Sequence, residues 1–153
     1  MIRLIADISV TPKRLSGWRN SVVSIVFLSV EDVIEICRDQ IQRYGGSFGV
    51  RDQGLLESAV AMPQAAFGGD YLHEDSSSMA AAYLFHLTMN HPFIDGNKRT
   101  GAMAAFVFLD LNGIELTATP DAFADFVLRI ASGQAEKSDA IAFFRDNSRP
   151  VVK

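Results

Sequence analysis

The sequence predicts a mainly α-helical fold. From residue 27 onward, apolar residues recur at intervals of three and four, which is the spacing of one helix face. Most of these segments begin after a serine, aspartate or proline and stop at a glycine, asparagine or proline, as helices do. Only the short run Ile114–Thr117 favours a strand, so any sheet is expected to be small.

Size and composition favour one folded domain. The chain has 153 residues, of which 48% are hydrophobic and 21% charged, so it can bury a core. The net charge is −4 and no basic stripe stands out, which argues against direct nucleic-acid binding as the main role. The single cysteine, Cys37, excludes an internal disulfide framework and a cysteine cluster for zinc. No segment approaches the roughly 20 apolar residues that span a membrane, so we expect a cytoplasmic protein.

The first 25 residues differ in charge from the rest. They carry a net charge of +3, whereas the remainder carries −7. Two interpretations stay open: a basic, poorly ordered N-terminal extension, or residues upstream of the true start of translation. In both cases this tail is expected to take no part in the chemistry, and the folded domain is expected to span residues 26–148.

The first helix is expected to begin after Ser29. This residue is a good N-cap, and Asp32 stands at the position that answers it in a capping box. Gly45 and Gly46 end the helix. Its expected apolar face is made of Val30, Val33, Ile34, Cys37 and Ile41.

A second, shorter helix is expected after Asp52, its cap, and is stopped by Pro63. Residues 64–75 are then expected to form a loop, a short β-hairpin or a flap. In this segment the pair Gly68–Gly69 permits unusual backbone angles, and Phe67 offers an apolar side chain.

Two helices in the middle of the chain are expected to form the core. The first runs from about Met79 to Asn90 and is capped by Asp75 and the serines after it. Because apolar residues lie on most of its sides, we expect it to be the central helix. The second, Arg99–Leu111, is almost wholly apolar and stops at Asn112–Gly113.

Two further helices are expected near the C-terminus. Pro120 stands where a first helical turn accepts proline, ahead of an apolar face made of Phe123, Phe126, Val127 and Ile130. Ser138 is expected to cap the last helix, which carries Ile141, Phe143 and Phe144.

The segment HPFIDGNKRT, residues 91–100, joins the two central helices. Pro92 and Gly96 predict a tight turn, and Asn97 lies at the start of the second helix. The first backbone N–H groups of a helix have no intrahelical partners, and the helix dipole is positive at that end. The turn therefore leads into a helix end that favours anions.

The side chains of this segment indicate phosphate chemistry. Lys98 and Arg99 add two positive charges at the helix end, which makes phosphate the expected ligand. Asp95 is placed to hold a magnesium ion that also contacts phosphate oxygens. His91 is the group here that accepts a proton near neutral pH. Together these residues predict phosphoryl or nucleotidyl transfer.

Each residue also has a purely structural explanation. Asp95 and Asn97 suit any turn, a lysine–arginine pair suits a solvated surface, and a lone histidine at a helix end is usually a cap. The combination favours a functional site, because two apolar helices rarely carry so many charged groups at their junction. His73 and His86 are assigned structural roles, the former in a loop and the latter in the core.

The motif resembles the signature of the Fic/Doc superfamily, and the likeness extends along the chain. The segments LSVEDVIEI, YGG…GVRDQGLLESAVAMPQAAFGG and NKRTGAMAAFVFLDLNG, with the closing ASG…F, are similar to the Doc (death-on-curing) branch. They cover residues 27 to about 148. The resemblance implies a compact helical bundle whose central, buried helix pair flanks the HPFIDGNKR loop.

Two positions depart from the wider Fic motif, HPFx(D/E)GNGRxxR. Lys98 stands where that motif has a glycine, and Ala102 where it has its last arginine. Resemblance to the Doc toxins implies that ATP binds in the reverse direction, so that its γ-phosphate passes to a threonine hydroxyl of elongation factor Tu and translation stops. Two alternatives stay open: an AMP transferase that uses the same histidine, and a catalytically silent, regulatory binding module.

The resemblance also implies roles for individual residues. His91 would be the general base and Asp95 the Mg²⁺ ligand. The segment Phe67–Gly69 would be the flap that guides the target. The residues expected to bind ATP are Phe93, Gly96, Asn97, Lys98 and Arg99, of which the last two would also neutralise the transferred charge.

The resemblance further implies a protein inhibitor. Doc toxins are held in check by a Phd-like antitoxin whose disordered C-terminal segment folds into a groove on the toxin. Many Fic proteins instead carry an inhibitory helix with the motif (S/T)xxxE(G/N). The nearest match, Ser132–Lys137, contains a glycine and lies in an expected loop, and Ala102 leaves its glutamate without an arginine. We attribute this match to chance and expect a separate antitoxin.

Overall fold

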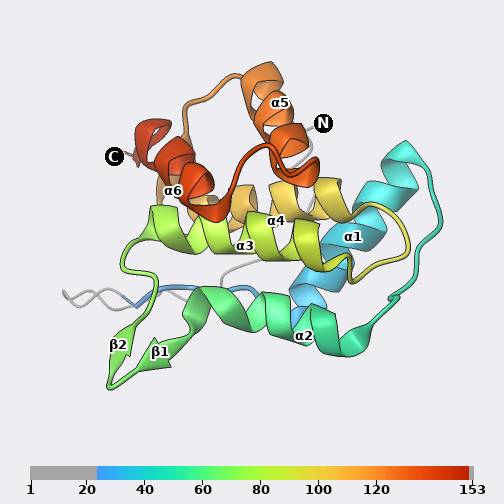
Figure 1. Cartoon of the computed structure of the whole chain (residues 1–153), viewed down its shortest axis with the longest axis horizontal. Helices are drawn as coiled ribbons and strands as arrows, with labels where there is room; N and C mark the ends of the chain where they lie inside the picture. The colour runs from blue at the N-terminus through green and yellow to red at the C-terminus, as the bar shows by residue number, and fades with distance from the viewer. Residues whose placement is uncertain (1–23, 152–153) are drawn as a thin grey trace.

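The computed structural model describes residues 24–151, and this part of the chain is mainly α-helical, as predicted (Figure 1). The helices are α1 (Val30–Tyr44), α2 (Gln53–Ala61), α3 (Ser76–Asn90), α4 (Asn97–Leu111), α5 (Pro120–Ala131) and α6 (Lys137–Asp146), with a 3₁₀ turn at Met62–Gln64. The strands are β1 (Ala66–Phe67), β2 (Asp70–Tyr71), β3 (Ile114–Leu116) and β4 (Ser148–Pro150). They form two antiparallel pairs, β1 with β2 and β3 with β4.

Helices α3 and α4 form the centre of the bundle. In Figure 1, α3 runs across the middle of the molecule, with α2 below it, α4 behind it and α6 above it. The two helices approach closely at Gly101, where an added Cβ would lie 2.8 Å from the Thr88 hydroxyl and 3.1 Å from the Leu84 carbonyl oxygen. The predicted central helix pair is therefore confirmed, and its packing depends on a residue without a side chain.

Helix α1 has the predicted ends. The Ser29 hydroxyl accepts the Asp32 N–H at 3.0 Å, and the Asp32 carboxylate accepts the Ser29 N–H at 2.9 Å. Gly45 ends the helix with φ of 95°. Of the predicted apolar face, Val30 and Ile34 are only half-buried, whereas Ile36 and Gln40 are fully buried. The buried face of α1 is therefore rotated slightly from the expected one.

Two helices begin earlier than predicted. The predicted Asp75 cap of α3 is confirmed, since its side chain accepts the Ser78 N–H at 2.8 Å, but the helix begins at Ser76, so the serines lie inside its first turn. Helix α6 begins at Lys137 and not after Ser138. There the Asp139 carboxylate accepts the Glu136 N–H at 2.8 Å, so an acidic pair provides the cap that was assigned to the serine.

The ends of the folded part are held by contacts distant in sequence. The predicted strand near residue 114 is β3, and its partner β4 continues to Pro150, past the expected boundary at residue 148. At the other end, the Asn112 side chain bonds both the N–H and the carbonyl of Val26 at 2.9 Å. The basic extension predicted for the first 25 residues lies almost wholly outside the described residues. No helix within residues 24–151 is long and apolar enough to cross a membrane.

Candidate active site

The loop between α3 and α4 is turned at both ends by left-handed backbone conformations. His91 directly follows α3 with φ of 50° and ψ of 53°, and Gly96 precedes α4 with φ of 81°. Glycine adopts this conformation freely, but it costs another residue roughly 1–2 kcal/mol. The surrounding contacts must therefore hold His91 in place.

The Asn97 side chain closes the loop from inside. Its Oδ1 accepts the Phe93 N–H at 2.9 Å, and its Nδ2 donates to the Phe93 carbonyl at 3.0 Å. The Phe93 ring is buried, with 1% of its surface exposed, so it anchors the loop in the core. Of the residues predicted to bind nucleotide, these two are thus the ones that fix the shape of the loop, and their contact with ATP stays a prediction.

A second segment, residues 47–52, runs antiparallel to the loop. We call it the template segment, because its backbone hydrogen bonds hold the loop in place. The Ile94 N–H donates to the Gly49 carbonyl at 2.9 Å, and Val50 forms an isolated β-bridge with Phe93. The Pro92 carbonyl accepts two backbone N–H groups, those of Arg51 at 2.7 Å and Asp52 at 3.1 Å. This segment was not predicted to be part of the site, because most of its bonds to the loop are made by backbone atoms, which leave no pattern in the sequence.

His91 is exposed, and its orientation suits a base. Its Nδ1 lies 3.2 Å from the Met89 carbonyl oxygen, which can only accept a hydrogen bond. The tautomer with its proton on Nδ1 satisfies this contact and leaves the lone pair on Nε2. The nitrogen that faces away from α3 is then the one that can accept a proton.

Asp95 is exposed and has one oriented carboxylate oxygen. Its Oδ2 accepts the Ser47 N–H at 2.9 Å, and a Cβ at Gly46 would lie 3.4 Å from the same oxygen. Within residues 24–151, no group of three or more histidine, cysteine or acidic side chains is arranged to hold a metal ion. One oriented, solvent-accessible carboxylate nevertheless fits Mg²⁺, which is commonly held by one or two carboxylates together with substrate phosphates and water.

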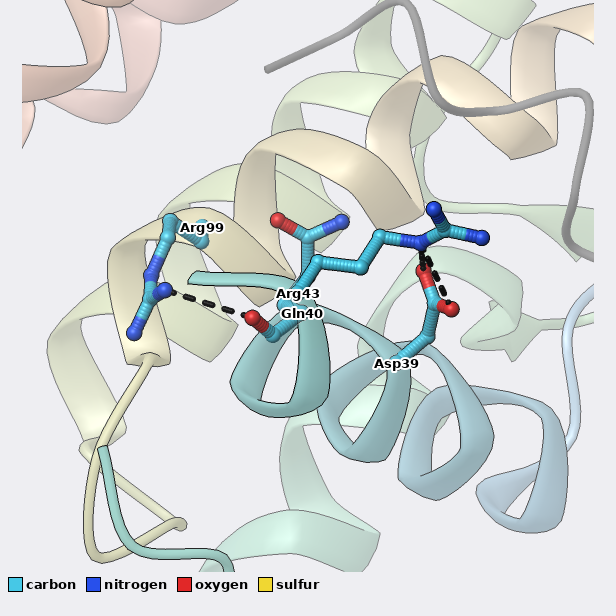
Figure 2. Close-up of polar contacts among 4 residues, drawn as sticks. All are labelled: Asp39, Gln40, Arg43 and Arg99. Carbon is cyan, nitrogen blue, oxygen red and sulfur yellow. Dashed lines mark hydrogen bonds and ion pairs between the residues drawn. The ribbon is translucent and has the colours of Figure 1, made fainter. Parts of the chain in front are cut away.

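The two cations after the loop differ in their contacts. The Arg99 guanidinium donates to the carbonyl oxygens of Gln40, at 3.3 Å, and Gly45, at 3.2 Å, both at the end of α1. Figure 2 shows the first of these bonds, and Arg43 on the same helix turned the opposite way, toward Asp39. Arg99 therefore ties α4 to α1 in this structure, whereas Lys98 is exposed at the start of α4.

Comparison with known protein families identifies the family of the chain. Residues 27–109, more than half of the chain, match the model of the Fic/DOC family. The chain belongs to the Fic/DOC family. The matched region includes the template segment, the loop, all of α3 and most of α4.

Two curated members of the Fic/DOC family are similar in sequence. The chain is 47% identical over 78 residues to the Toxin Doc of Mycolicibacterium smegmatis, an alignment that covers 51% of this chain and 60% of that protein. It is 32% identical over 111 residues to the Protein kinase doc of Escherichia phage P1, which covers 72% of this chain and 86% of that protein.

The residues predicted to form the flap do not lie at the Fic/DOC loop. The turn of the β1–β2 hairpin is Gly68 and Gly69, with φ of 62° and 89°, and Phe67 is 80% exposed. The hairpin leads into the start of α3, whereas His91 follows its end, about 20 Å away at 1.5 Å per residue (Figure 1). The segment beside the loop is 47–52. A target-guiding role for Phe67–Gly69 stays a prediction.

An apolar hollow of about 230 Å³ lies between α4 and α5 of this Fic/DOC domain. Ala102, at the position of the last arginine in the wider Fic motif, is part of its wall. The lining residues are Lys98, Arg99, Ala102, Phe123, Ala124, Val127 and Leu128. This chain thus has an apolar surface, edged by two cations, at this position.

Of the other two histidines, His73 lies in a loop as predicted, whereas His86, expected in the core, is only half-buried. His86 is half-buried on α3, with its Nε2 2.9 Å from the Lys137 ammonium. Burial first, then the nearby charges of Lys137 and His73, lowers the pKa of His86 to about 4. His73 is buried in its loop, and burial likewise lowers its pKa. Both rings are therefore neutral at pH 7.

Proposed function

We propose that this chain is a Doc-like toxin that transfers the γ-phosphate of ATP to a hydroxyl group of a protein. The observation that carries the proposal is the arrangement of the loop. An exposed histidine, whose Nδ1 is held by the Met89 carbonyl, and an oriented carboxylate, Asp95, lie in the loop that leads into the N-terminus of α4. The names of the two relatives, a toxin and a protein kinase, support the same conclusion.

In the proposed reaction, His91 Nε2 accepts the proton of the target hydroxyl. The hydroxyl oxygen forms a bond to the γ-phosphorus, the bond from phosphorus to the β–γ bridging oxygen breaks, and ADP leaves. Asp95 would hold Mg²⁺, which when bound neutralises charge on the phosphates. The free backbone N–H groups in the first turn of α4 would bind phosphate oxygens.

Lys98 and Ala102 favour phosphate transfer over AMP transfer. Lysine adds bulk and charge at the first turn of α4, where the wider Fic motif has glycine. At the position of the last motif arginine, Ala102 is 5% exposed and apolar, so it offers no donor to a phosphate. AMP transfer remains the second candidate, since it uses the same histidine and the same carboxylate.

We further propose that the target is a translation factor, with a threonine of elongation factor Tu as the first candidate. We also propose a cognate, Phd-like antitoxin as inhibitor. A toxin must be restrained in the cell that makes it, and the match at Ser132–Lys137 does not provide the restraint. Most of that segment is the linker between α5 and α6, in which Ser132 is the C-cap of α5 and Glu136 the N-cap of α6.

A growth experiment tests the toxin proposal. The protein is produced from an inducible promoter in bacteria, in parallel with His91→Ala and with the matched control His86→Ala, which removes a histidine outside the loop. Growth arrest by the wild type and the control, but not by His91→Ala, supports an enzymatic toxin. Arrest that survives His91→Ala contradicts it and favours the silent binding module.

A further inference from the structure

The end of α3 is held by a side chain that the motif does not contain. The last carbonyl groups of a helix have no intrahelical partners and need other donors. Arg51, in the template segment, supplies them. Its Nε donates to the His91 carbonyl at 2.6 Å, and its Nη2 donates to the Asn90 carbonyl at 3.0 Å.

The same residue also fixes the next peptide group. The Arg51 backbone N–H donates to the Pro92 carbonyl at 2.7 Å, and the Asp52 N–H joins it at 3.1 Å. The carbonyls of Asn90, His91 and Pro92 are thus held in sequence by Arg51 and its neighbour. The peptide groups before and after His91 are therefore both held by hydrogen bonds from Arg51.

These contacts bear on the conformation of His91 itself. A non-glycine residue with φ of 50° stays in that conformation only where its surroundings impose it. The planar fork of a guanidinium can bond two adjacent carbonyls at once, which the single ammonium of lysine does less well. The Asn90 side chain also ties the end of α3 to α2, because its Nδ2 donates to the Leu55 carbonyl at 3.1 Å.

We propose that Arg51 is a positioning residue for the general base. Through the backbone of residues 90 and 91 it keeps the His91 imidazole in the orientation that places Nδ1 on the Met89 carbonyl and Nε2 toward the substrate. Its role rests on the proposed phosphate transfer, but its effect on His91 does not. Arg51 acts through His91, so its loss should impair the chemical step more than the binding of ATP.

The test compares four proteins: wild type, Arg51→Ala, Arg51→Lys and the control Arg145→Ala. Arg145 is also exposed but pairs with Asp75 at the opposite end of α3. The imidazole nitrogens of His91 are observed by NMR in the free proteins, and kcat and KM for ATP are measured separately. Melting curves show whether each variant is folded.

We expect Arg51→Ala to lower kcat about 10- to 100-fold with little change in KM, since a small misplacement of a catalytic group has effects of this size. Its His91 signals should change from a single tautomer to a mixture. Arg51→Lys should lie between it and the wild type, and Arg145→Ala should match the wild type. If Arg51→Ala does not fold, Arg51→Lys provides both readouts.

The inference is overturned if the His91 signals of the Arg51 variants equal those of the wild type, or if only KM rises. If the wild type transfers no phosphate, the proposed function fails, but the NMR comparison still decides whether Arg51 orients His91.

Discussion

The Asp95 carboxylate accepts the backbone N–H of Ser47 at 2.9 Å, so the only acidic side chain of the motif is oriented by the template segment. This bond fixes Oδ2 and directs the carboxylate without burying it. The loop alone therefore does not define the site. The segment before α2 determines where its acid points.

Replacing Asp95 with asparagine should separate orientation from charge. The amide oxygen can still accept the Ser47 N–H, so the melting temperature should stay close to that of the wild type. Without the negative charge the proposed Mg²⁺ ligand is lost, and phosphate transfer should fall about 100-fold or more. Activity measured across a Mg²⁺ titration checks this. If Asp95→Asn were as active as the wild type at low Mg²⁺, Asp95 would not be the Mg²⁺ ligand.

Asn97→Ala should loosen the loop more than it destabilises the domain. The change removes two hydrogen bonds to Phe93, each with a net contribution of about 1 kcal/mol. We expect faster hydrogen exchange at the Phe93 amide and a loss of activity. Asn147→Ala is the matched control, because the Asn147 Nδ2 bonds the Phe143 carbonyl in the same way on α6. Equal losses of activity in both variants would mean that loop closure is not the cause.

Gly101→Ala should destabilise the central helix pair. The added methyl group would lie 2.8 Å from the Thr88 hydroxyl and 3.1 Å from a backbone oxygen that cannot rotate away. Overpacking of this kind costs about 1–3 kcal/mol, which urea unfolding can measure. Gly54→Ala provides the control on α2, where the nearest atom is 3.5 Å away. A stable Gly101→Ala protein would show that α3 and α4 separate at little cost.

Stability should fall as the pH drops from about 6.5 to about 4, and His86 should be one cause. Its pKa is lowered from 6.5 to about 4 in the folded protein, chiefly by burial, so the unfolded chain binds the proton first in this range. The contribution of the neutral His86 to the free energy of unfolding is thus fully present above pH 6.5. After allowance for solvent screening we expect a loss of about 1–2 kcal/mol. Unfolding of His86→Gln at pH 7 and pH 5 should show a smaller difference than in the wild type, and an equal difference would contradict this origin.

Local signals in the sequence predicted most of the fold. The Ser29–Asp32 capping box, the glycine after α1, Pro120 at the start of α5 and the apolar helix pair are all decided by residues close in sequence. The same holds for the loop, because its left-handed Gly96 and the helix start at Asn97 follow from the order of residues in the motif.

Contacts between distant segments were not predictable in the same way. The bonds from residues 47–52 to residues 91–95 join parts of the chain about 40 residues apart, and mostly involve backbone atoms that carry no sequence signal. The place of the hairpin was not predictable either: Gly68–Gly69 has the composition of a functional turn, but α3 separates it from His91. The contacts of Arg51 depend on the same pairing.

The most direct test of phosphate transfer uses purified protein, Mg²⁺ and elongation factor Tu, with ATP labelled in parallel at the α- or the γ-phosphate and His91→Ala as control. We predict that label passes to the target only from the γ-phosphate and only with the wild type. Label from the α-phosphate would show that AMP is transferred, and would contradict the roles given to Lys98 and Ala102.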